Sequence, residues 1–188
     1  IVAIADVAHY VQAGGPIDQE ALVRGTSVYF PERVIPMLPA TISNELCSLK
    51  PEVHRLALVC DMQVSSSGKV LGHDFYEALI YSHARLTYTE VEKFLNGKTL
   101  PWSDAVTESV DALTAVYEAL RRAREKRGAL DFPTHEASLR LENGTVAEIS
   151  PVARLVANQV IEEAMIAANV CAARFLEEAG LSSLYRVH

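Results

Sequence analysis

One segment near the C-terminus constrains the fold more than any other part of this sequence. Between residues 164 and 173 nearly every side chain is apolar. Ser150 and Pro151 form an N-cap followed by a proline, which favours a helix start, and Gly180 favours its end. Because a helix that is apolar on most sides must be buried on most sides, the sequence predicts a long central helix over residues 151–180.

A polar stripe interrupts this apolar helix and needs a physical reason. Four polar residues fall within about an 80° arc of the helix: Arg154, Asn158, Glu162 and Asn169. An unpaired buried carboxylate is strongly destabilising, so Glu162 needs a hydrogen-bond donor from the protein or from a ligand hydroxyl. Spacing alone favours a structural network over a ligand site.

A second long helix is predicted from an N-cap at Ser103 to Gly128, with apolar residues at spacings of three and four. Five of the 17 positive charges lie in its last turns: Arg121, Arg122, Arg124, Lys126 and Arg127. Cations near a helix C-terminus complement its dipole, which favours a solvated surface. The alternative is a patch that contacts phosphates.

Strand patterns occupy much of the remaining chain. Residues 1–11 and 184–188 are typical of strands, and residues 55–64 and 71–82 predict two strands joined by a Ser/Gly turn at Gly68.

Asn143-Gly144 predicts a second hairpin, and short helices are expected over residues 18–25 and 40–49. The prolines between those helices require an extended, irregular segment. We therefore expect an α+β domain that has a mixed sheet, β-hairpins and two long helices.

The composition of the chain limits the classes of protein to which it can belong. The 188 residues fit one domain, and 24 acidic against 17 basic residues give a formal charge of −7, so a polyanion would need a local basic patch. No stretch approaches a membrane span and no leader opens the chain, so a cytoplasmic protein is expected. The three cysteines show neither a disulfide framework nor a zinc pattern.

Both ends of the sequence fall inside strand patterns, whereas domain boundaries usually lie in polar linkers. We therefore expect the chain to be part of a larger domain. The alternative is a small natural protein whose terminal strands pair with each other.

Catalytic motifs are scarce. The sequence has no GxSxG, HExxH or Gly-rich nucleotide loop, and its six histidines are isolated. Its seven aspartates are never nearer than seven residues apart. The sequence thus predicts no catalytic and no metal-ligating residue within the chain.

Five ordered motifs nevertheless resemble one family. They are RGTSVYFPERVIPMLP (24–39), ISNELCSL (42–49), SHARLTYTEV (82–91), AREKRGALDF (123–132) and IEEAMIAANVCAARFL (161–176). Together with IVAIADVAHYV at the start and LYRVH at the end, they resemble the catalytic RNB domain of the ribonuclease R and ribonuclease II exoribonucleases, the former more closely.

The resemblance implies a processive 3′-to-5′ exoribonuclease that hydrolyses single-stranded RNA to nucleoside 5′-monophosphates with Mg²⁺. It implies that the metal-binding aspartates precede residue 1 and that the arginine and glutamate completing the site follow residue 188. The 188 residues would then be a partial RNB domain, inactive alone, from a parent protein with flanking cold-shock and S1 domains. The competing hypothesis is a non-catalytic RNA-binding or protein-interaction module derived from the same domain.

Four residues match family positions that contact RNA. Tyr29 and Phe132 resemble the aromatic pair that clamps the stacked bases of the RNA 3′ end. Tyr88 and Glu162 resemble the pair associated with selecting ribose over deoxyribose. The resemblance therefore favours a ligand role for Glu162, since a carboxylate can accept a hydrogen bond from a 2′-hydroxyl.

Overall fold

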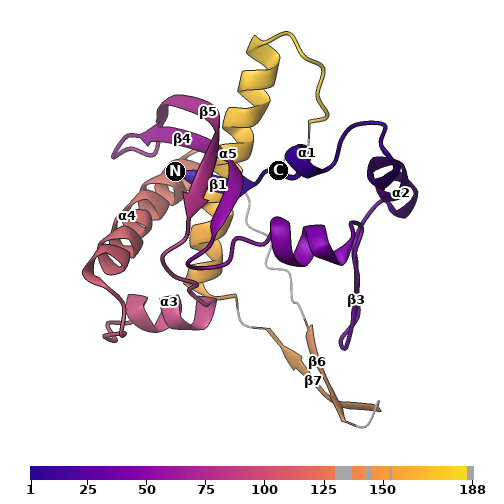
Figure 1. Ribbon diagram of the computed structural model, residues 1–188. Coiled ribbons are helices and arrows are strands. Elements are labelled where there is room, and N and C mark those ends of the chain that lie inside the picture. The colour runs from indigo at the N-terminus through magenta and orange to yellow at the C-terminus, as the bar shows by residue number, and fades with distance from the viewer. Residues whose placement is uncertain (130–136, 143–144, 153, 186–188) are drawn as a thin grey trace.

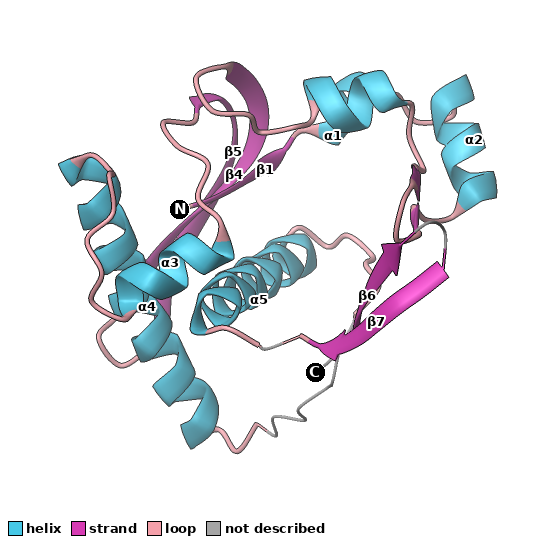
Figure 2. Cartoon of the chain, turned by 90° about the horizontal axis from the view of Figure 1, so that it is seen from below, coloured by secondary structure: helices cyan, strands magenta, loops and turns pink. Residues whose placement is uncertain are grey.

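The computed structural model describes residues 1–129, 137–142, 145–152 and 154–185. A three-stranded sheet of order β1-β4-β5 lies against the long helix α5 (Figures 1 and 2). Its strands are β1 (Val2–Ala5), β4 (His54–Val64) and β5 (Val70–Tyr81), and both pairings are antiparallel. The α+β class is confirmed. A mixed sheet was expected, but every named strand pair in the described residues is antiparallel. The single-residue bridge between Pro51 and Ser82 is parallel.

Two long helices form the other side of the core. They are α4 (Asp104–Lys126) and α5 (Val156–Glu178), while α3 (Tyr88–Leu95) crosses near the start of α5 (Figure 2). The small side chains of Cys60, Ala168 and Cys171 allow β4 and α5 to pack closely. The apolar run of residues 164–173 therefore supplies part of the core through Ala167, Ala168 and Cys171, but it is not buried on most sides as predicted, because Met165 and Val170 are exposed.

The remaining elements are short and extend from this body. They are α1 (Val7–Tyr10), α2 (Pro16–Arg24), β2 (Val28–Tyr29), β3 (Val34–Ile35), the short π-helix η1 (Thr41–Leu46), β6 (Ala137–Glu142) and β7 (Thr145–Pro151). In Figure 1 the β6-β7 hairpin projects away from the core. The turn predicted at Asn143-Gly144 lies outside the described residues.

The β4-β5 turn is built around Gly68. Its φ of 76° lies in the region that glycine adopts without strain, as the sequence predicted. A Cβ atom there would stand 2.1 Å from the carbonyl oxygen of Ala119 on α4. Gly68 therefore serves the turn and also permits a close approach between the hairpin and α4.

Several predicted boundaries were wrong. The helix expected over residues 18–25 spans Pro16–Arg24, with Gly15 as its N-cap. The first strand ends at Ala5, because the side chain of Asp6 accepts a hydrogen bond from the His9 amide at 3.1 Å and caps α1. The central helix begins at Val156, since Ser150 and Pro151 pair with β6 in the second hairpin. Near the C-terminus, residues 184–185 form no strand, and residues 186–188 lie outside the described part of the chain. No helix in the described ranges is long and apolar enough to cross a membrane.

Candidate functional site

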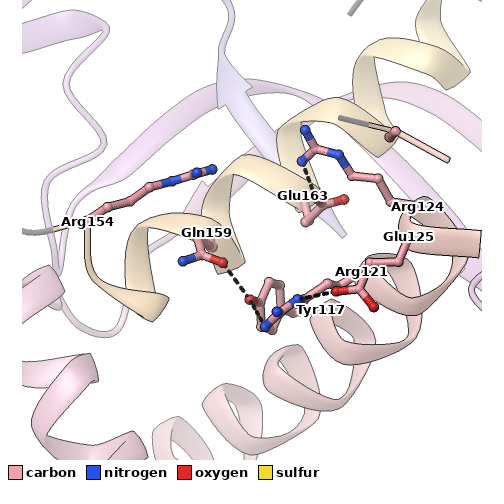
Figure 3. A pocket seen from close by; sticks show the side chains of 8 residues that line it. Tyr117, Arg121, Arg124, Glu125, Arg154, Gln159 and Glu163 are labelled. Carbon is pink, nitrogen blue, oxygen red and sulfur yellow. Dashed lines mark hydrogen bonds and ion pairs between the residues drawn. The ribbon is translucent and has the colours of Figure 1, made fainter. Parts of the chain in front are cut away.

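A buried ion pair joins α4 to α5. Arg124 Nη1 donates a hydrogen bond of 2.6 Å to Glu163 Oε1 (Figure 3). Glu163 is 7% exposed and is the one charged residue that is buried among those the structure describes. A buried carboxylate requires such a partner, so this pair fixes the C-terminal half of α4 against α5.

Glu162, the preceding residue, lies at the edge of this contact. Its side chain is 39% exposed, and its Oε2 accepts a hydrogen bond of 2.6 Å from Arg154 Nη2. Arg124 Nη1 lies 3.6 Å from its Oε1. The expectation that Glu162 is the buried carboxylate is thus corrected: α5 turns Glu163 inward, because successive helix residues are separated by about 100°.

The two oxygens of Glu162 differ in their surroundings. Oε2 is held by Arg154, whereas Oε1 accepts no hydrogen bond from any donor within the described ranges. A carboxylate can accept about four hydrogen bonds, so Oε1 retains acceptor capacity. Glu162 is therefore oriented by the protein and still open to a hydroxyl donor.

A small polar cavity of about 90 Å³ lies beside these pairs. Its lining residues come from α4, α5 and the segments next to them: Tyr117, Arg121, Arg124, Glu125, Ala129, Arg154, Gln159 and Glu163 (Figure 3). Tyr117 Oη donates to Gln159 Oε1 at 2.9 Å, and Arg121 Nε donates to Glu125 Oε1 at 3.0 Å. The cavity wall thus contains hydrogen-bonded side chains of both charges as well as the neutral pair Tyr117–Gln159.

The basic end of α4 is largely neutralised within the protein. Arg121 pairs with Glu125, and Arg122 pairs with Glu118 at 3.5 Å. Arg124 turns inward to α5, which leaves Lys126 and Arg127 as the members of this cluster that form no ion pair with described residues. The solvated-helix interpretation accounts for most of the cluster.

Tyr88 is the first residue of α3 and is 48% exposed. Thr87 caps this helix, accepting from the Glu90 amide at 3.3 Å, while Glu90 Oε2 accepts from the Thr87 amide at 2.9 Å. The hydrogen bond from the Thr87 hydroxyl is the largest cause that lowers the pKa of Glu90. This capping box fixes the backbone at Tyr88.

A contact that the sequence did not predict connects α3 to α5. Glu92 Oε2 accepts a hydrogen bond of 3.1 Å from the Ala157 amide in the first turn of α5. Tyr88 and Glu92 are four residues apart and therefore lie on one face of α3. The helix carrying Tyr88 is thus attached to the start of the helix carrying Glu162. Because Glu92 and Ala157 are 65 residues apart in the sequence, no local sequence pattern predicts this cap.

Of the two aromatic residues expected to clamp RNA bases, Tyr29 lies within the described residues and Phe132 does not. Tyr29 lies on β2 with 77% of its surface exposed, and the β2-β3 hairpin is closed by a hydrogen bond of 2.8 Å from the Phe30 amide to the Arg33 carbonyl. In the described part of the chain no hydrogen bond or ring contact joins Tyr29 to Tyr88 or Glu162. Phe132 lies outside the described residues.

No three His, Cys, Asp or Glu side chains in the described ranges are close enough to hold a metal ion together. These residues by themselves do not fit the Mg²⁺ site that the family resemblance implies.

Comparison with known proteins defines the class to which this fold belongs. The RNB domain model matches residues 1–188, and the chain belongs to the RNB domain family. It is 48% identical over 190 residues to "Ribonuclease R" of Escherichia coli strain K12, covering all of this chain and 23% of that protein. It is 43% identical over 194 residues to "Ribonuclease R" of Thermotoga maritima, of which it covers 27%. The chain thus spans about a quarter of the length of these relatives.

Solved structures agree with this family. Mycoplasma genitalium RNase R in complex with ribose methylated single-stranded RNA matches with a TM-score of 0.94 at 34% identity, over 99% of this chain and 29% of that chain. Yeast Ssd1, described as a pseudonuclease, matches with a TM-score of 0.61 at 20% identity and shares the fold alone. The interpretation of the five motifs as those of an RNB domain is confirmed.

Proposed function

We propose that this chain is part of a 3′-to-5′ exoribonuclease that processively hydrolyses single-stranded RNA to nucleoside 5′-monophosphates. Membership of the RNB domain family and similarity to ribonuclease R along the whole chain support this proposal. The structural match to an RNase R that holds ribose methylated single-stranded RNA supports RNA as the ligand.

The observation that carries the proposal is the carboxylate of Glu162, of which one oxygen is hydrogen-bonded to Arg154 and the other can still accept a hydrogen bond. Arg154 holds Oε2 at 2.6 Å, so the carboxylate has a fixed orientation, while Oε1 keeps acceptor capacity. A 2′-hydroxyl is a donor that RNA has and DNA lacks. Glu162 would therefore accept a hydrogen bond from the ribose, with Tyr88 as the second residue that selects the sugar.

Base contacts would come from Tyr29 and Phe132. A base stacked on an aromatic ring gains roughly 1–3 kcal/mol irrespective of its identity. The large exposed surface of Tyr29 is available for such stacking. A clamp of this kind suits an enzyme that degrades RNA of any sequence.

Hydrolysis would need Mg²⁺, which the family resemblance assigns to residues outside these 188. Divalent metal activates water and neutralises charge on the leaving oxygen. Flanking cold-shock and S1 domains, and a cytoplasmic location, complete the proposal. The 188 residues would thus bind and select RNA, while residues outside them would bind the metal. The 188 residues alone would be inactive.

The test is a nuclease assay on the full-length protein that contains this chain. A 5′-labelled single-stranded RNA should shorten from its 3′ end with release of nucleoside 5′-monophosphates, and EDTA should abolish the reaction. The isolated 188 residues should release none under the same conditions. RNA binding by the full-length protein without any hydrolysis would instead identify a non-catalytic RNA-binding module.

A further inference from the structure

We infer that Arg124 and Glu163 form a positioning pair that keeps Oε1 of Glu162 open for the ribose. This inference rests on the proposed role of Glu162 and adds two residues that lie outside the sugar contact itself. It begins from the adjacency of Glu162 and Glu163 on α5, where both carboxylates face the same guanidinium.

The two carboxylates share Arg124 unequally. Nη1 lies 2.6 Å from Glu163 Oε1 but 3.6 Å from Glu162 Oε1, the latter beyond hydrogen-bonding distance. The Glu163 side chain is 8% exposed and the Arg124 side chain 22% exposed. A charge-assisted hydrogen bond is strong where water is excluded, so Glu163 holds the guanidinium more firmly than Glu162 does.

This unequal sharing has a consequence for the neighbouring carboxylate. At 3.6 Å the guanidinium still attracts Glu162 and offsets its repulsion by Glu163, yet it leaves the Oε1 lone pairs free. Without the Glu163 charge, Arg124 would be drawn to Glu162 and would occupy Oε1. Glu163 therefore acts through Arg124 to preserve the acceptor that reads the sugar.

The experiment is a double-mutant cycle in the full-length enzyme. The measured quantity is the ratio of cleavage rates on matched RNA and DNA oligomers for the wild type, Glu163→Gln, Glu162→Ala and the double variant. Glutamine keeps the shape of Glu163 and an oxygen for Arg124 but removes the charge. We expect Glu163→Gln to lower the RNA-to-DNA ratio roughly tenfold, the size of a partly lost charge-assisted hydrogen bond.

In the Glu162→Ala background the further change Glu163→Gln should leave the ratio unaltered, because the residue through which it acts is gone. An equal effect in both backgrounds would overturn the inference. So would a wild-type ratio in Glu163→Gln while Glu162→Ala lowers it, a result that leaves the proposed function standing. If Glu162→Ala itself leaves the ratio unchanged, the sugar-reading role fails and the inference fails with it.

A second variant guards against loss of folding. Arg124→Gln combined with Glu163→Gln replaces both charges of the buried pair by amides, so neither charge is left without the other. It should restore the ratio toward the wild-type value, because Arg154 still orients Glu162 and no guanidinium from position 124 remains to occupy Oε1. Arg122→Gln is the matched control, since Arg122 is an exposed residue of the same helix paired with Glu118, and it should keep the wild-type ratio. A ratio in the double glutamine variant that stays as low as in Glu163→Gln would overturn the inference.

Discussion

The guanidinium of Arg124, on α4, faces two consecutive carboxylates of α5, with its Nη1 2.6 Å from Glu163 Oε1 and 3.6 Å from Glu162 Oε1. One carboxylate is buried and holds two helices together, while the other is half-exposed and keeps a free acceptor. Neighbouring residues of the same type thus serve different purposes, because the helix turns one inward and the other to the edge of the contact.

The buried pair should matter for stability. Arg124→Ala leaves Glu163 buried without its partner, a change that costs about 3–5 kcal/mol in comparable buried pairs. Arg122→Ala removes an exposed pair and should cost less than about 1 kcal/mol. Thermal unfolding of the two full-length variants compares them, and equal losses would show that the Arg124 contact is no stronger than a surface pair.

The β4-β5 turn offers a second test of stability. Gly68→Ala combines a positive φ with a Cβ only 2.1 Å from the Ala119 carbonyl oxygen, so α4 or the turn must move. We expect a loss of at least about 1 kcal/mol. Gly72→Ala is the control, because no atom lies within 4 Å of its added Cβ and its φ is not positive. The midpoints of thermal unfolding of both variants should separate; coinciding midpoints would contradict the close packing of Gly68 on α4.

The β4-β5 hairpin and most of α4 could be predicted from sequence because their signals are local. Gly68 marks the turn, and Ser103 accepts from the Val106 amide at 3.3 Å as an N-cap should. The start of α5 could not be predicted in this way. Ser150-Pro151 has the pattern of a helix start, but strand pairing with β6 takes these residues, and Glu92 from α3 caps the helix instead.

In the candidate site, too, some features were predicted from the sequence and others were not. Helical periodicity placed Arg154 and Glu162 on one stripe of the helix, but α5 begins at Val156 and Arg154 precedes it. The two side chains nevertheless meet at 2.6 Å, with Arg154 reaching Glu162 from the segment before the helix. The periodicity did not distinguish Glu162 from Glu163, because the inward direction of α5 is set by its packing on β4 and α4. Family motifs identified Tyr29 and Tyr88, whose exposure the structure shows and whose roles remain predictions.

Cysteine reactivity should follow burial. Burial is the largest cause that raises the pKa of Cys60 to about 11, and it also raises the pKa of Cys171. Since the thiolate is the reactive form, the raised pKa values slow reaction at Cys60 and Cys171. Cys47 is only partly buried and should react first with a thiol reagent under native conditions, although its pKa is also raised. Mass spectrometry of the alkylated sites provides the measurement, and labelling of Cys60 or Cys171 before Cys47 would contradict the packing of β4 on α5.

The base clamp predicts an effect on end products. In the full-length enzyme Tyr29→Ala should leave a longer final fragment, or bind the final fragment more weakly, because the terminal bases lose a stacking surface. Tyr76→Ala removes another exposed aromatic residue, on β5, and should leave the end product unchanged. Gel analysis of a 5′-labelled RNA measures the length of the final fragment that each of the two variants leaves. A wild-type end product of wild-type affinity from Tyr29→Ala would show that Tyr29 does not stack on the RNA.

The most direct test of the account measures sugar selection by Glu162 and Tyr88. Cleavage rates of matched RNA and DNA oligomers are compared for the full-length wild type, Glu162→Ala and Tyr88→Phe. A site built to accept from a 2′-hydroxyl is left unsatisfied by DNA, so the wild type should strongly prefer RNA. Glu162→Ala should lose activity on RNA moderately while its relative activity on DNA rises, and Tyr88→Phe should change in the same direction by less. If both rates fall by the same factor in Glu162→Ala, Glu162 does not read the sugar and the central claim is wrong.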